Sequence, residues 1–284
     1  MNPDSKPPVH GNGASHERQM EYWTQQLKRS NPAEFLLDKP RPGVLSTSNI
    51  SKQEFNITSS LYDHIQRFSK DHQVPPLSIL LAAFRVTHFR LSGTEDATIG
   101  TNKSGASLGP EDVGTEQSPN WRDLQCIRIK VQDEFTFEQV VRLVDGTLKN
   151  ANLNQEISFG DLISQISPQG SDLSRHLLIQ MVFSLNFTSL IEVFVTTNGG
   201  MAENCSSNFP VLDLEFRLSQ TSGGLYEHAF FCQDLFHEET IRAIIEVFYE
   251  VLNRGMGEPK SPIASLRISG KGNPEKKAIS SDSQ

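Results

Sequence analysis

The chain has 284 residues and a mass of 31.7 kDa, with 36% hydrophobic residues and a mean hydropathy of −0.39. This length permits one large domain or two small ones, and the composition supports a core but is too polar for a membrane protein. The 26 Lys and Arg against 34 Asp and Glu give a net charge of −8. Non-specific nucleic-acid binding and attraction to anionic membranes both need cations, so neither partner is expected.

The cysteines and the N-terminus indicate a cytoplasmic protein. Cys126, Cys205 and Cys232 are odd in number, far apart and without a CxxC pair. This pattern is typical of a reducing compartment. The N-terminus lacks the apolar segment of a secretory signal and the Arg-rich character of a transit peptide.

The predicted elements lie between two polar tails. Residues 1–15 and 269–284 are rich in polar residues with Pro and Gly, so both are expected to be disordered. Residues 16–29 repeat apolar side chains at helical spacing, which predicts an amphipathic helix. An extended Pro-rich piece follows at residues 37–42.

Short strands alternate with helices in the middle of the chain. Residues 53–57 alternate like a strand, and Thr58 can cap the helix that follows. Residues 77–91 are apolar on nearly every side, which predicts a helix buried in the centre of the domain. A strand at residues 96–101 leads into a polar loop at residues 102–120, and loops of this length are functional or loosely ordered.

The last part of the chain predicts several strands between helices. The remaining expected elements are a strand at residues 124–131, a helix at 135–152, a helical turn at 159–166, strands at 178–187, 191–197, 211–218 and 225–232, and a helix at 238–253. Gly223 and Gly224 are interpreted as a hairpin turn. The sum predicts a layered α/β domain of mixed α+β character, with a mixed sheet flanked by helices.

Histidines are the natural candidates for acid–base chemistry. None of the eight lies in an HExxH motif or beside a second histidine, so no metal site is expected. Phosphate-binding glycine motifs and the GxSxG elbow are also absent from the sequence. His88 falls in the buried helix, where a hydrogen-bonded core imidazole is the favoured interpretation and a catalytic role is the alternative.

A polar turn precedes the apolar strand expected at residues 178–187. It contains Asp172, Ser174 and Arg175. The simplest interpretation is that these side chains bond to each other or to nearby backbone and fix the start of the strand.

Five ordered blocks of the chain resemble the condensation domain of nonribosomal peptide synthetases. Tyr22-Trp23 with Leu27, followed by LDKPRP at residues 37–42, is similar to the family's YWxxxL … LPTDRPRP passage. The other blocks are LSILLAAFRVTHFRLSGTEDATIGT (77–101), NQEISFGDLISQI (154–166), SDLSRHLLIQMVFSLNF (171–187) and GLYEHAFFCQDLFHEETIRAIIEVFYEVL (224–252). The blocks run in the family's order, and the composition resembles that of fungal members.

The resemblance implies a set of structural motif positions. These are Tyr22, Trp23, Asp38, Pro40, Arg41, Asp96, Gly100, Asp123, Asn154, Phe159, Asp172, Ser174, Arg175 and Gln180. Four positions depart from the family pattern: Asp123 stands for Asn, Leu124 for Thr, Asn154 for His and Ser158 for Pro. Such drift suggests relaxed selection on catalysis.

The resemblance also implies a fold and an extent. Family domains are about twice this size and consist of two lobes, each resembling chloramphenicol acetyltransferase. This chain is expected to hold the C-terminal lobe with its lead-in helix, as one truncated domain at residues 16–268. The family's catalytic HHxxxDG motif belongs to the other lobe, and no His-His pair occurs here, so no catalytic residue is expected. A single lobe would expose an apolar surface.

The implied activity joins an acyl group on one carrier-protein thioester to an amine on another, giving an amide or ester. These substrates are carried on phosphopantetheine, and no cofactor is expected to bind the chain directly. We expect a lobe that is inactive alone. The alternatives are an acyltransferase, completed by a partner lobe or homo-oligomer or using His88 or His176 as a substitute base, and a binding module. The expected partners are carrier or adenylation domains, or the other lobe.

Overall fold

A computed structural model describes residues 12–46, 49–103, 124–166, 175, 177–185, 212–221 and 224–268. Its centre is a six-stranded sheet in the order β1-β6-β5-β4-β2-β3. The strands are β1 (Ile50–Phe55), β2 (Asp96–Asn102), β3 (Leu124–Lys130), β4 (Met181–Leu185), β5 (Leu214–Thr221) and β6 (Gly224–Cys232). The helices are α1 (Asn12–Leu27), α2 (Ser59–His72), α3 (Pro76–Ser92), α4 (Phe137–Leu153), α5 (Phe159–Ile166) and α7 (Glu238–Gly257), with a final 3-10 turn at Ile263–Ser265.

The sheet is mixed, as the sequence predicts. Strand β4 runs parallel to β2 and to β5, whereas the other neighbouring strands are antiparallel. The antiparallel β5–β6 pair ends at Thr221 and Gly224, so Gly224 lies in β6 and not in the expected turn, and Gly223 lies outside the described residues. The layered arrangement of a mixed sheet with helices is therefore confirmed.

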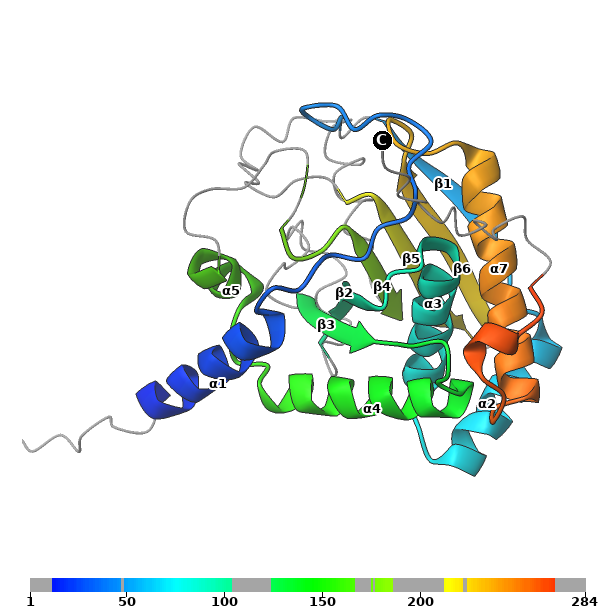
Figure 1. The fold of residues 1–284 in the computed structure, drawn as a ribbon, viewed down its shortest axis with the longest axis horizontal. Helices are drawn as coiled ribbons and strands as arrows, with labels where there is room; N and C mark the ends of the chain where they lie inside the picture. The colour runs from blue at the N-terminus through cyan, green and yellow to red at the C-terminus, as the bar shows by residue number, and fades with distance from the viewer. Residues whose placement is uncertain are drawn as a thin grey trace, which may run out of the picture.

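One face of the sheet carries the main helical layer (Figure 1). Helix α3 packs between α4 and α7, and its residues from Ser78 to Phe89 are all buried, as expected for a helix that is apolar all round. The rings of Phe84 on α3 and Phe248 on α7 meet those of Phe183 on β4 and Phe216 on β5. These aromatic contacts form the centre of the core.

Helix α1 lies at the β3 edge of the sheet (Figure 1). Trp23 is buried, and its Nε1 donates to the carbonyl of Asn154 at 2.8 Å. Arg128 of β3 donates to the carbonyls of Gln26 and Lys28 at the end of α1. Helix α1 is thus fixed both to the α4–α5 connection and to the edge strand.

An extended segment, residues 31–46, crosses the end of the sheet, and we call it the strap. It begins at β2, where Ala33 N donates to the Thr98 carbonyl and Pro32 forms a parallel bridge with Thr98. It then reaches the loop after β6, where the amides of Asp38 and Lys39 donate to the carbonyl of Leu235. The strap therefore runs along one end of the sheet from β2 to β6 (Figure 1).

Several predicted bounds are accurate and others are not. The helical turn at Phe159–Ile166 has its predicted bounds, and Thr58 Oγ1 accepts from the amide of Leu61 as the expected cap. The strand expected at residues 53–57 forms at Ile50–Phe55 instead. It ends before Ile57 because the amide of Ile57 donates to the Glu227 side chain. The strand expected at residues 191–197 and most of the loop at 102–120 lie outside the described residues.

Candidate functional site

The strap is held to the sheet by a buried ion pair. Arg41 Nη1 donates to Asp213 Oδ1 at 2.8 Å, and Nη2 pairs with Oδ2. Burial raises the pKa of Asp213, while the hydrogen bond and charge of Arg41 act in the opposite direction. Burial lowers the pKa of Arg41, but Asp213 outweighs it, so the net shift is upward. Each ion is thus stabilised by the other.

A second ion pair lies beside the first. Arg175 pairs with Glu34 of the strap. The charges of Glu34 and Arg175 also act on Asp213, so the two pairs form one network of two acids and two bases. Arg175 therefore has a partner 141 residues away in the chain, whereas the local contacts expected with Asp172 and Ser174 lie outside the described residues.

His88 on α3 contacts the strap at Glu34 and is fully buried. Its Nδ1 lies 3.2 Å from Arg85 Nη1, and its Nε2 lies 3.0 Å from the carbonyl and 3.1 Å from the amide of Glu34. Because the guanidinium only donates, Nδ1 of the neutral ring accepts from Arg85. Burial, together with the charge of Arg85, lowers the pKa of His88 to about 3, against the opposing hydrogen bond to Glu34. A fully buried imidazole with this pKa is a poor general base.

Asp38 of the strap caps helix α7. Its carboxylate accepts from the amide of His237 at 2.8 Å and from Thr240 Oγ1 at 2.9 Å. The residue at the N-cap position, His237, makes no side-chain cap of its own. A strap residue therefore satisfies one amide and one hydroxyl at the start of a helix about two hundred residues away in the chain.

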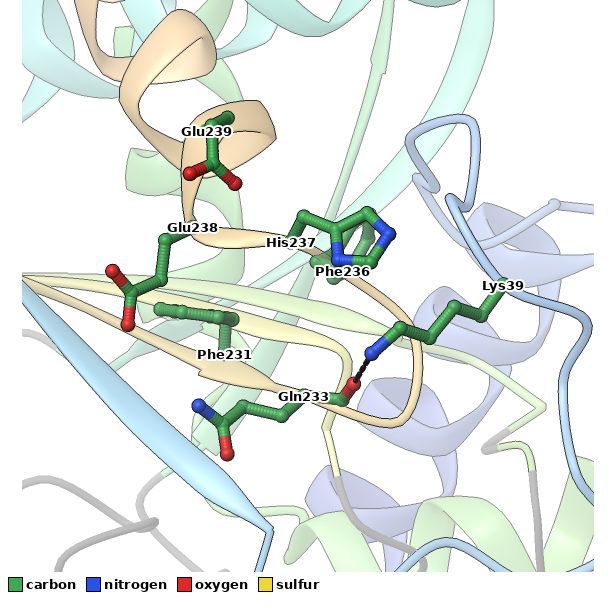
Figure 2. A pocket seen from close by; sticks show the side chains of 7 residues that line it. All are labelled: Lys39, Phe231, Gln233, Phe236, His237, Glu238 and Glu239. Atoms are coloured by element: carbon green, nitrogen blue, oxygen red, sulfur yellow. Dashed lines mark hydrogen bonds between the residues drawn. The ribbon is translucent and has the colours of Figure 1, made fainter.

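A pocket of about 350 Å³ opens between the strap and the first turn of α7 (Figure 2). Lys39 donates its Nζ to the Gln233 carbonyl at 2.6 Å, and Glu238 and Glu239 lie at the opposite side in Figure 2. The remaining lining residues are Phe231, Phe236 and His237. The lining residues include no Ser or Cys, so this pocket offers neither side chain for a covalent acyl-enzyme.

The other predicted motif residues fall into two structural groups. The first lies around α1: the ring of Tyr22 meets Trp23 edge to face, and Phe159 is buried at the start of α5. The second lies on β2, where Asp96 forms a paired ion contact with Arg128 at 2.6 and 2.8 Å. That contact lowers the pKa of Asp96.

Gly100 is required by close packing between β2 and β4. A Cβ at this position would meet Val182 Cγ2 at 2.9 Å and Ile179 Cδ1 at 3.1 Å. Gln180 is fully buried before β4, and its carbonyl accepts from the amide of Asp213 at 2.9 Å. Pro40 is exposed on the strap.

The structure thus brings Asp38, Arg41, Arg175, Gln180 and His88 together along the strap. Their partners Glu34, Arg85 and Asp213 were missed from the sequence. Asp213 gave one signal, since it interrupts an apolar run between Leu212 and Leu214. Four predicted positions lie outside the described residues: Asp123, Asp172, Ser174 and His176.

Neither a metal centre nor a membrane span is found in the part of the chain that the structure describes. No three described His, Cys, Asp or Glu side chains are grouped to hold a metal ion. Among the described helices, none is long and apolar enough to cross a bilayer.

Comparison with known proteins places these features in a family. The family model described as "Condensation domain" matches residues 11–276. Nonribosomal peptide synthetase kk1B of Curvularia clavata is 38% identical over 264 residues, and Nonribosomal peptide synthetase 30 of Fusarium vanettenii is 39% identical over 255 residues. The matches cover 90% and 89% of this chain but 2% and 4% of those fungal proteins.

A solved structure shares the fold. The X-domain from teicoplanin biosynthesis superposes with a TM-score of 0.70 at 17% identity, over 90% of this chain and 58% of that one. The chain therefore spans a small part of its curated relatives and somewhat more than half of this structural neighbour. On the strength of the family match and the relatives, the chain belongs to the condensation domain family of nonribosomal peptide synthetases.

Proposed function

We propose that this chain contributes the C-terminal lobe of a condensation domain and is inactive by itself. In this proposal the complete domain joins an acyl group to an amine, both delivered as thioesters on the phosphopantetheine arms of carrier proteins, and forms an amide or ester. The strap and its ion pairs fix one wall of the space in which the two arms meet. Positioning of two bound reactants can supply a large part of such a rate enhancement.

The proposed inactivity rests on one observation, the absence of the family's catalytic histidine pair from this sequence. The 284 residues contain no His-His pair, so the HHxxxDG motif is absent from this sequence. His88 does not replace it, because both of its ring nitrogens are engaged and its pKa is lowered to about 3. Proton transfer at neutral pH needs an accessible group with a pKa near the working pH.

The test supplies the missing residues from outside. The purified chain is incubated with an acyl-loaded and an aminoacyl-loaded carrier protein, alone or with a separately expressed lobe that contains HHxxxDG. Products are followed by mass spectrometry. We expect no amide from the chain alone and amide formation when both lobes are present, lost again when the second His of the supplied motif is replaced by Ala.

Two outcomes would redirect the proposal. Amide formation by the chain alone would contradict it, and His176→Ala would then test the substitute base. Saturable carrier-protein binding without turnover in either mixture would favour the binding-module alternative. Size-exclusion chromatography of the same sample would show whether a homo-oligomer is the active species.

A further inference from the structure

Glu227 is a buried carboxyl group without a cation. It lies on β6, is 1% exposed, and faces the helical layer together with Phe216 and Phe183. No described Lys, Arg or His forms an ion pair with it. An unpaired carboxylate is costly in such surroundings, because nothing replaces the water it loses.

The polar contact of Glu227 is with the turn that joins β1 to α2. Its Oε2 accepts from the backbone amide of Ile57 at 3.0 Å, while Oε1 has no hydrogen-bond partner among the described residues. The backbone of Asn56, the preceding residue of the turn, lies near Tyr249 on α7, whose hydroxyl has no hydrogen-bond partner among the described residues. The Glu227 carboxyl therefore holds this turn, which we call the β1–α2 corner (residues 56–58).

The groups around Glu227 leave its charge uncompensated. Helix α7 presents Tyr249, with Glu246 and Glu250 nearby along the helix, and the first two turns of α2 carry Tyr62, Asp63 and His64. The charged residues of the neighbouring strands, and His228 of β6 itself, point to the opposite face of the sheet by register. Those of the neighbouring strands are Lys52, Glu54, Glu215 and Arg217. Burial raises the pKa of Glu227 to about 8, and the Ile57 amide opposes this shift.

The corner and the strap lie at opposite ends of β1. Strand β1 is an edge strand, and the residue before its start is tied to the strap's end: Asp234 accepts from Ser46 N and from Asn49 Nδ2. Opening of the corner would therefore loosen an edge strand that pairs with β6 alone among the described strands.

We propose that Glu227 is a proton switch that keeps the β1–α2 corner closed while its carboxyl is protonated and favours opening when the proton is lost. The closed corner binds the proton more tightly than the open one, where Glu227 meets water. Opening therefore becomes easier as the pH rises from about 4.5, the ordinary value of a glutamate, to about 8, and is constant above that. This inference holds whether or not the chain takes part in acyl transfer.

The first test compares wild type with E227Q, which retains an acceptor for the Ile57 amide but carries no titrating proton. Unfolding constants are measured in urea at pH 5 to 9. The ratio of the wild-type constant to that of E227Q isolates this carboxyl, because other titrating groups are common to both proteins. We expect the ratio to rise about tenfold per pH unit and by up to about a thousandfold in total.

The matched control is E246Q, which removes an exposed carboxyl from the same helix layer. It should give the wild-type profile. Amide hydrogen exchange then distinguishes local from global opening: Ile57 should lose protection between pH 5 and 8 beyond the intrinsic pH effect, whereas Val140 in α4 should not. A flat wild-type to E227Q ratio, or equal loss at both amides, would overturn the switch.

A direct measurement covers the case in which E227Q does not fold. The wild-type protein, labelled with ¹³C at glutamate carboxyls, is titrated by NMR. A carboxyl resonance that titrates near pH 8 and is absent from a conservative E227D variant supports the switch. Titration of every glutamate near pH 4.5 overturns it.

Discussion

At the scale of single residues, the strap is held by two ion pairs whose partners lie far apart in the sequence. Asp213 lies 172 residues after Arg41, and Glu34 lies 141 residues before Arg175. Both pairs lie where the strap crosses the sheet, and Asp213 is 2% exposed. Buried pairs of this kind add little net stability, but removing one partner leaves a charge that water cannot reach.

Replacing Arg41 should therefore be costly. We expect Arg41→Ala to lower the free energy of unfolding by about 3 kcal/mol, because Asp213 is left buried and unpaired. Urea denaturation at pH 7 measures the change. The control is Arg242→Ala, which breaks an exposed helix pair with Glu238 and should cost less than about 0.5 kcal/mol. Similar losses in both variants would mean that the Asp213 pair is not effectively buried.

His88 should govern the acid limb of the stability profile. Its pKa is lowered to about 3 in the fold, so the unfolded chain binds the proton first, at about pH 6.5. The contribution of neutral His88 to the free energy of unfolding is at its maximum above about pH 6.5. It falls by about 1.4 kcal/mol per pH unit as the pH drops from there toward 3. His88→Gln should flatten the limb in urea titrations, whereas replacing exposed His16 by Gln should not.

At the level of elements, a glycine inside a helix is tolerated for different reasons in α4 and in α7. Gly146 on α4 has open space where a Cβ would lie, but a Cβ on Gly255 of α7 would lie 2.6 Å from the ring of Phe137. Glycine lowers helix stability in both positions. At Gly255 this loss is offset by the close approach of α7 to the start of α4.

Alanine at these two glycines should therefore have opposite effects. We expect Gly146→Ala to stabilise the protein by up to about 1 kcal/mol, through helix propensity alone. Gly255→Ala should destabilise it by about 1–3 kcal/mol, because Phe137 must move in a packed core. Thermal and urea unfolding of both variants provide the measurement, and stabilisation by both would mean that the contact is loose.

At the scale of the whole molecule, apolar side chains remain exposed along the strap. Leu36 is 88% exposed and Val44 64%, and Leu177, next to Arg175, is 43% exposed. The polar side chains of the same region are engaged in ion pairs and caps. An apolar surface supported by a fixed polar framework is typical of an interface.

The isolated chain should bind a hydrophobic dye while folded. We expect enhanced fluorescence of such a dye at pH 7, and we expect Leu36→Gln with Val44→Thr to reduce it by at least half without changing the urea midpoint, since neither side chain is in the core. The same double change on the exposed face of α4, Leu143→Gln with Leu153→Gln, is the control. Equal reductions in both would place the dye site elsewhere.

Local signals in the sequence specified most of the elements. The all-round apolar pattern of residues 77–91 predicted the buried helix α3, and residues 124–131 were correctly expected to form β3. Bounds failed where a distant group competes for the backbone, as at Ile57, whose amide bonds to Glu227. For the candidate site, the motif positions Asp38, Arg41 and Arg175 were found, but none of their partners.

The sequence alone therefore determined the family, the helices and strands, and the absence of a His-His pair, because these depend on residue identity and on spacings of a few positions. The tertiary structure alone decided that Asp38 caps α7, that Asp213 and Glu34 neutralise the two arginines, and that His88 is closed to solvent. These outcomes depend on which segments meet when the chain closes over the sheet. Pairing across more than one hundred residues leaves no local pattern, and desolvation acts only once the packing is complete.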